Sequence, residues 1–133
     1  FVPGKRLTEV ELFILTSERT FSAAEEFTYD LQSLERAVVV GEVTGGGAHL
    51  TTRMVVDDNF YLFVPFAGAL NPVTNTNWEG VGIQPDVEVN EEEALKTAHL
   101  LALKALNDKA MDADWKKSLT SIITKMETEK NEK

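Results

Sequence analysis

The sequence of 133 residues contains no cysteine, which excludes disulfide bonds, a cysteine nucleophile and thiolate metal ligands. Basic residues are scarce: 13 Lys and Arg face 22 Asp and Glu, for a net charge of −9. Because phosphate binding needs clustered Lys and Arg, a nucleic-acid partner is not expected. No apolar run approaches the roughly 18–20 residues of a membrane span. The two histidines match no H-x-x-x-H or H-E-x-x-H pattern, so no metal or cofactor is predicted.

The apolar content of 43 % is typical of a globular chain. Residues 1–90 carry 13 acidic and 5 basic side chains, whereas residues 91–133 carry 9 and 8. We therefore predict an acidic α/β core over residues 1–90 and a charge-balanced helical extension over residues 91–133 that packs on it. The sequence begins at Phe1, with neither an initiator Met nor a signal peptide. We expect a fragment or a processed product whose preceding part belongs to the same protein.

Hydrophobic patterning predicts the order of elements in the core. The apolar run Val10–Leu15 is typical of a buried strand, Ser22–Leu34 has helical spacing, and Ala37–Gly41 is β-branched. A strand, helix and strand with short links predict a βαβ unit and a parallel sheet. A hairpin follows, in which the aromatic segment Phe60–Phe66 is predicted as a core strand. The remaining predicted elements are a strand at Arg53–Val56, extended segments at Val81–Ile83 and Val87–Val89, and helices at Glu91–Leu106 and Asp112–Lys130, the second with an apolar stripe that includes Trp115.

Ser22 lies where the first strand passes into a helix, and two interpretations fit it. With Glu25 three residues later it matches the capping box S-x-x-E, a purely structural role. A helix N-terminus also offers free N–H groups and partial positive charge, which favour a developing oxyanion beside a nucleophilic serine. Such a serine needs a base within hydrogen-bond reach, and the local pattern does not supply one.

Two longer motifs bear on this choice: T-S-E-R-T-F-S-A-A-E-E followed by V-G-E-V-T-G-G-G-A-H, and the later N-W-E-G-V-G-I-Q-P-D. Together they resemble the tail-specific, or C-terminal processing, serine protease family over about residues 12–89. The resemblance implies a mixed α/β sheet of crotonase-like or ClpP-like fold with βαβ units, followed by helices. It also implies a protein or peptide substrate, Ser22 as the nucleophile and the Ala23 amide as part of the oxyanion hole.

One departure from the family pattern concerns the base. Many members carry a lysine base at the position that Gly47 occupies here. The sequence instead resembles the tricorn-like branch, which includes the interphotoreceptor retinoid-binding protein modules. There the base is a histidine from an earlier segment, and Glu79 is the best match for a supporting glutamate. We therefore expect an imported base and an isolated chain that is proteolytically inactive.

Other residues receive weaker assignments. Gly45, Gly46, Gly47 and His49 are interpreted as a loop that contributes to a substrate groove, and His99 as a structural histidine. A non-catalytic module that binds an apolar ligand or an unfolded peptide is the alternative function, and an acyl-coenzyme A enzyme shares only the fold. The sequence leaves the oligomeric state open, a homo-oligomer included. A periplasmic or extracellular bacterial location is implied only by the resemblance.

Overall fold

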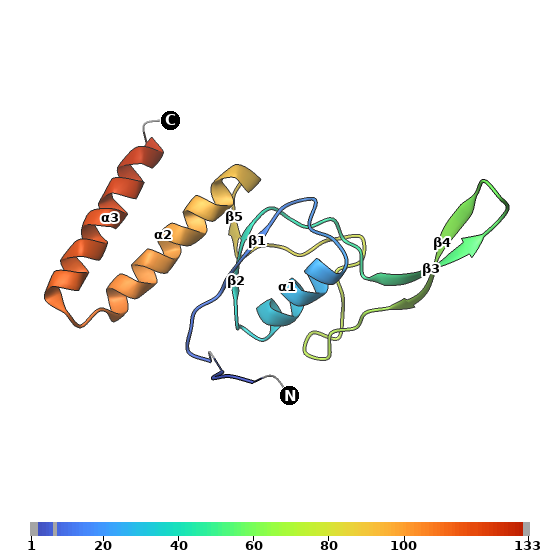
Figure 1. The fold of residues 1–133 in the computed structure, drawn as a ribbon, viewed down its shortest axis with the longest axis horizontal. Coiled ribbons are helices and arrows are strands. Elements are labelled where there is room, and N and C mark those ends of the chain that lie inside the picture. The colour runs from blue at the N-terminus through green and yellow to red at the C-terminus, as the bar shows by residue number, and fades with distance from the viewer. Residues whose placement is uncertain (1–2, 7, 132–133) are drawn as a thin grey trace.

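The computed structural model describes residues 3–6 and 8–131, and the side chains up to residue 128. The molecule is elongated (Figure 1): two long helices lie at one end, a small sheet and one helix in the middle, and a hairpin projects at the other end. Within the described residues, no helix is long and apolar enough to cross a membrane.

Three parallel strands form the central sheet in the order β1-β2-β5. Strand β1 (Phe13–Thr16) pairs with β2 (Val38–Gly41), which in turn pairs with β5 (Val87–Glu88). Helix α1 (Ala23–Ser33) joins β1 to β2, so the predicted βαβ unit is present. The first strand begins at Phe13 rather than Val10, because its pairing with β2 starts there.

The central strand β2 is covered on both faces. Val39 and Val40 are each 0 % exposed, although neighbouring residues of a strand point to opposite faces. Helix α1 lies on one side of the strands and helix α2 (Glu91–Lys109) on the other (Figure 1). This arrangement accounts for the continuous run of Val residues, which is typical of a buried parallel strand.

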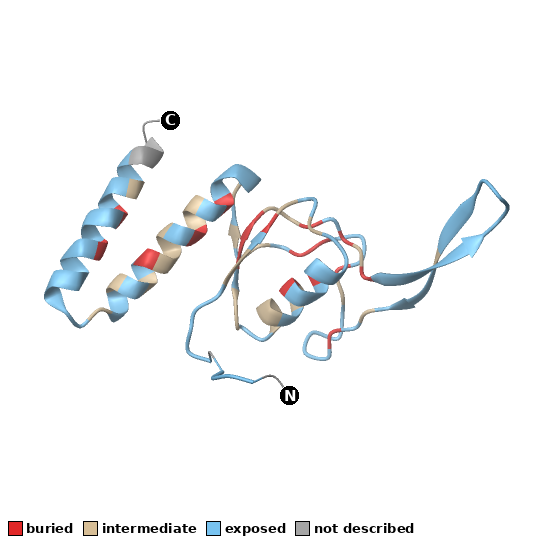
Figure 2. Cartoon of the chain, viewed as in Figure 1, coloured by how far each residue is buried: buried red, intermediate tan, exposed pale blue. Residues whose placement is uncertain are grey.

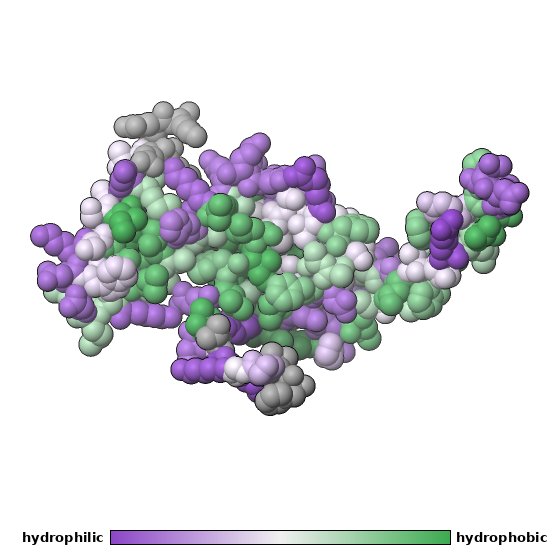
Figure 3. Space-filling view, viewed as in Figure 1, coloured by the Kyte–Doolittle hydropathy of each residue, from purple (hydrophilic) through white to green (hydrophobic). Residues whose placement is uncertain are grey.

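The hairpin consists of β3 (His49–Val55) and β4 (Tyr61–Gly68), paired from His49–Gly68 to Val55–Tyr61. Almost every residue in it is exposed (Figure 2), including Phe60 at 67 % and Phe66 at 66 %. The prediction of a core strand at 60–66 is therefore wrong for this chain. The apolar pattern itself is present, and Figure 3 shows hydrophobic residues on the hairpin beside hydrophilic ones, but the hairpin extends away from the body of the molecule.

Helix α3 (Ala113–Asn131) packs against α2 through a small apolar core. Leu103 of α2 and Leu119 and Ile123 of α3 are its buried members. Trp115 belongs to the apolar stripe predicted for this helix, but it is 52 % exposed and lies outside the buried cluster. Leu119 and Ile123, which are four residues apart, pack against α2. Trp115 lies one turn nearer to the start of α3 and is not a buried member of this core.

Candidate active site

Ser22 sits at a sharp bend between β1 and α1. It is the N-cap of α1, with φ 57° and ψ −122°, and the predicted capping box with Glu25 is present. This conformation costs a non-glycine residue on the order of 1–3 kcal/mol, and residues strained in this way cluster at functional sites. Ser22 is also exposed, so the bend presents its side chain to solvent. A simple helix cap adopts an extended backbone and does not need this strain.

A cavity of about 400 Å³ opens beside this bend. Its walls come from the start of α1, the glycine loop, both strands of the hairpin and the segment before Glu79. The lining includes Ser22, Ala23, Gly47, His49, Phe66 and Trp78. The structure therefore brings Ser22, Ala23, Gly47 and His49 to one cavity, whereas Gly45 and Gly46 are not among its lining residues and His99 is exposed on α2.

Glu79 approaches the same cavity from the loop after Trp78. Its Oε2 accepts hydrogen bonds from the backbone N–H groups of Ala48 (2.6 Å) and His49 (2.9 Å). Its Oε1 lies 3.1 Å from Nδ1 of the His49 ring. The carboxylate thus holds both the backbone and the imidazole of His49. Asn77 orients the loop, because its Oδ1 accepts from the Glu79 N–H and its amide donates to the Ala69 carbonyl.

The sequence identified Glu25 only as the partner of Ser22 in the capping box, and its other contacts at the site were not predicted. It is 0 % exposed and accepts four hydrogen bonds: Oε1 from the Thr44 hydroxyl and the Gly46 amide, and Oε2 from the Gly47 and Ser22 amides. Burial raises the pKa of Glu25, but the hydrogen bonds outweigh it and hold the pKa below its ordinary value. Glu25 is therefore a buried carboxylate that stays ionised.

The glycine loop is shaped by the ring of Phe21, the residue before Ser22. A Cβ atom at Gly47 would lie 2.2 Å from Cζ of Phe21, and one at Gly45 would lie 2.8 Å from its Cδ2. Gly46 adopts φ +82°, a conformation that glycine tolerates best. Each glycine thus has its own steric reason, and together they allow the loop to pass under Phe21.

A small apolar core supports the floor of the site. Trp78 is 3 % exposed and packs with Ala48 and Ile83, while the ring of Tyr29 lies 5.3 Å from it, centroid to centroid. The buried Nε1–H of Trp78 has no hydrogen-bond partner among the described residues. Trp78 therefore contributes to the site through its volume.

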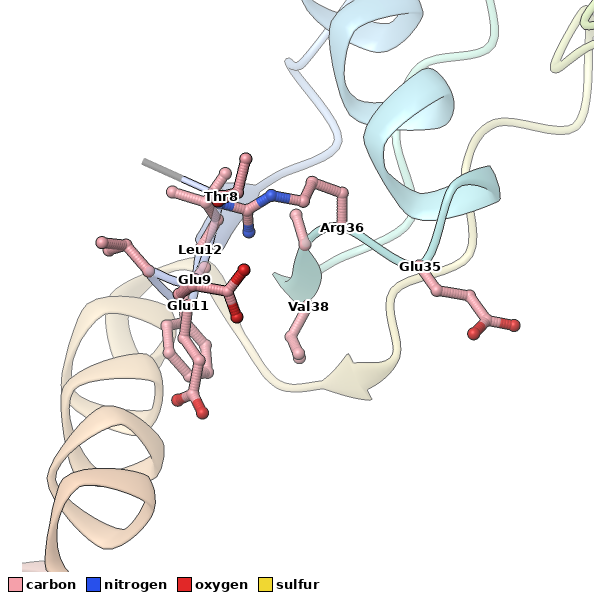
Figure 4. A pocket seen from close by; sticks show the side chains of 10 residues that line it. Thr8, Glu9, Glu11, Leu12, Glu35, Arg36 and Val38 are labelled. Carbon is pink, nitrogen blue, oxygen red and sulfur yellow. The ribbon is translucent and has the colours of Figure 1, made fainter. Parts of the chain in front are cut away.

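A second cavity, of about 370 Å³, lies at the opposite end of the sheet, beside the chain that enters β1. In Figure 4, the Arg36 side chain reaches across to the segment of Thr8 and Leu12, while the Glu35 side chain points away. Its lining contains neither serine nor histidine. It therefore holds no candidate for a serine nucleophile or a histidine base.

Comparisons with known proteins bear on the family and the fold. A model of peptidase family S41 matches residues 3–89. The chain is similar to the photosystem II D1 C-terminal processing protease, with 25 % identity and a TM-score of 0.54 over 63 % of this chain and 22 % of that one. It is similar in fold to mature CPAF, with 19 % identity and a TM-score of 0.57 over 77 % and 22 %. The predicted α/β class, with a parallel sheet and C-terminal helices, is confirmed, and the chain spans about a fifth of both structures.

Proposed function

The chain belongs to peptidase family S41, and on this premise we propose that it is the part of a serine-type endopeptidase that carries the nucleophile, Ser22. The observation that supports this most is the strained, exposed backbone of Ser22 at the mouth of the cavity. The substrate in this proposal is an unfolded protein or peptide, cleaved near its C-terminus as in the tail-specific proteases.

The chemistry follows from the place of Ser22 at the start of α1. Its Oγ attacks the scissile carbonyl carbon, its proton passes to a base, and the carbonyl oxygen becomes an oxyanion. The Ala23 amide, in the first turn of α1, has no intrahelical acceptor and faces this charge together with the positive end of the helix dipole. The intermediate collapses to an acyl-enzyme as the amine leaves with a proton from the base, and water then hydrolyses the ester.

The base in this proposal is a histidine from a preceding segment of a longer polypeptide, as in the tricorn-like branch. Two observations support that branch. Gly47 has no side chain that could supply a lysine amino group, and the Glu79 carboxylate accepts a hydrogen bond from Ala48, which lines the Ser22 cavity. Glu79 would orient the imidazole and stabilise its positive charge. His49 already holds that carboxylate through Nδ1, and its ring lines the cavity as part of the substrate groove.

The test uses the longest natural polypeptide that contains these 133 residues. We expect Ser22→Ala to abolish hydrolysis of unfolded casein and labelling by a fluorophosphonate, whereas Ser33→Ala, at the other end of α1, retains both. Labelling or cleavage that persists in Ser22→Ala would reject Ser22 as the nucleophile.

The source of the base is tested separately. The isolated chain should be inactive, and His49→Ala in the longer polypeptide should change KM more than kcat. Turnover by the isolated chain that disappears in His49→Ala would make His49 the base instead.

The alternative function, a non-catalytic module for an apolar ligand or unfolded peptide, draws on the aromatic side chains of the hairpin. These side chains are exposed in the described chain. Absence of fluorophosphonate labelling in the longer polypeptide, together with tight retinol binding, would favour this alternative over the peptidase.

A further inference from the structure

Four consecutive backbone amides run along the site, and each donates a hydrogen bond to one of two carboxylates. The N–H groups of Gly46 and Gly47 donate to Glu25, at 2.7 and 2.8 Å. The next two, of Ala48 and His49, donate to Glu79, at 2.6 and 2.9 Å. The glycine loop and the start of β3 are thus clamped along their length.

Glu25 connects this clamp directly to the backbone of the nucleophile. Its Oε2 accepts from the Gly47 amide and also from the Ser22 amide, at 2.7 Å, so one oxygen atom joins the loop to the strained bend. Its Oε1 accepts from Thr44, whose hydroxyl oxygen in turn accepts from the Ile83 amide at 2.8 Å. The carboxylate therefore ties three chain segments together at a point three residues from Ser22.

The four hydrogen-bond donors to Glu25 are all neutral groups, and two of them are backbone amides of glycines. A buried carboxylate is tolerated only when its oxygens are hydrogen-bonded. An amide in its place would turn an NH₂ group toward one pair of these N–H and O–H donors, and the clamp would open on that side.

We propose that Glu25 is a positioning residue for the peptidase reaction: it fixes the Ser22 bend at a set distance from the loop that leads to His49. The proposal rests on the proposed function, because it assigns to Glu25 the placement of that nucleophile. Glu25 does not touch the substrate. By occupying the Ser22 amide, it also leaves the Ala23 amide as the donor that faces the oxyanion.

The first measurement does not depend on activity. In ¹H–¹⁵N spectra of the 133-residue chain, amides that donate to a carboxylate resonate downfield. We expect Glu25→Gln to move the Ser22, Gly46 and Gly47 amides upfield together, whereas the Ala48 and His49 amides, held by Glu79, stay within the range seen in the control Glu35→Gln. Glu35 is exposed just beyond α1. Unchanged Gly46 and Gly47 amides in a folded Glu25→Gln variant would overturn the clamp.

The second measurement concerns the nucleophile, in the longest natural polypeptide that contains the chain. We expect Glu25→Gln to lower kcat and the rate of fluorophosphonate labelling at least tenfold, with KM changed less than about threefold, because binding surfaces remain while the serine is misplaced. Glu25→Asp keeps the charge but is one methylene shorter, so it should recover part of the loss. Wild-type kcat in Glu25→Gln would overturn the positioning role.

The two proposals fail in different ways. If the wild-type polypeptide is not labelled at Ser22, the proposed function fails, and the amide shifts still decide whether Glu25 holds the loop. If the wild type is labelled and Glu25→Gln is labelled at the same rate, Ser22 remains the nucleophile and the role assigned to Glu25 is rejected. If Glu25→Gln does not fold, Glu25→Asp supplies both measurements, with smaller effects of the same sign expected.

Discussion

The ring of Phe21 limits which residues fit at position 47, and this predicts a measurable energetic coupling between positions 21 and 47. In Gly47→Ala the new Cβ atom would lie 2.2–2.7 Å from three atoms of that ring, Cζ, Cε1 and Cε2. Either the ring or the loop must move. Moving the loop would break hydrogen bonds from Gly46 and Gly47 to an ionised carboxylate, each contributing on the order of 1.5–3 kcal/mol. The ring therefore moves.

The cost of moving the ring follows from its burial. Phe21 is 57 % exposed, so retraction loses less than half of the roughly 1.5–3 kcal/mol for a fully buried Phe, or about 1 kcal/mol. The φ of Gly47 is not positive, so alanine can adopt its backbone conformation. Alanine also restricts the unfolded chain, which stabilises the folded protein by about 0.4–1 kcal/mol. The net change in the free energy of unfolding is then a loss of about 0–0.6 kcal/mol. In a Phe21→Ala background the clash is absent, and Gly47→Ala should stabilise by about 0.4–1 kcal/mol.

Urea denaturation of the four variants, followed by far-ultraviolet circular dichroism, measures this coupling of about 1 kcal/mol as a double-mutant cycle. Gly46→Ala is the matched control. Its φ of +82° and its backbone neighbours make it destabilising whether or not Phe21 is present. Additive effects of Gly47→Ala and Phe21→Ala, within about 0.3 kcal/mol, would show that the Phe21 ring does not restrict position 47. By the same steric argument, a lysine at position 47 requires displacement of this ring.

Three further predictions concern the core, the acid limb of stability and the hairpin. Trp78→Phe should cost less than about 1.5 kcal/mol in urea denaturation, because the buried Nε1–H has no partner among the described residues, whereas Trp78→Ala should cost about 3–5 kcal/mol; equal losses would contradict this. The pKa of Glu25 is lowered in the folded protein. Its contribution to folding stability is therefore complete above the unfolded carboxylate pKa of about 4.3 and is lost as the pH falls through the folded pKa. Acid titrations of stability should show this loss in the wild type and a weaker one in Glu25→Gln. Endoproteinase Asp-N should cut the isolated chain first at the exposed Asp57 and Asp58 of the hairpin turn, and early cleavage elsewhere would show that the hairpin is held.

Local pattern predicted the elements whose determinants are local. The Val run of β2 and the start of α2 at Glu91 each depend on residues a few positions apart, and the structure confirms both. Helix α1 is present as well, but Phe27 and Leu34 of its apolar spacing are exposed, at 61 % and 64 %. The N-cap role of Ser22 was likewise readable from Glu25. The strain at Ser22 was not, because a φ of 57° results from how the bend is held by distant segments.

The roles that sequence reasoning missed depend on contacts between distant residues. Glu25 meets Thr44, Gly46 and Gly47 at separations of 19, 21 and 22 residues, and Glu79 meets His49 at 30. The capping box reports only the bond to Ser22. The error at Phe60–Phe66 has another origin: strand periodicity predicts apolar faces, but it does not say whether this chain supplies the layer that covers them.

The clamp also constrains how the proposed reaction can stabilise charge. The amides of Ser22 and of residues 46–49 already donate to carboxylates, so they are not free to receive an oxyanion. Two carboxylates near the nucleophile favour a positively charged imidazolium but oppose a third anion, the oxyanion, beside them. The first turn of α1 begins at Ala23, and the Ala23 amide and the helix dipole act in the required direction, whereas the amides of residues 24–26 already donate to the carbonyls of Phe21 and Ser22. The cleavage chemistry proposed for Ser22 therefore depends on α1 as an electrostatic element, in addition to its role in carrying the serine.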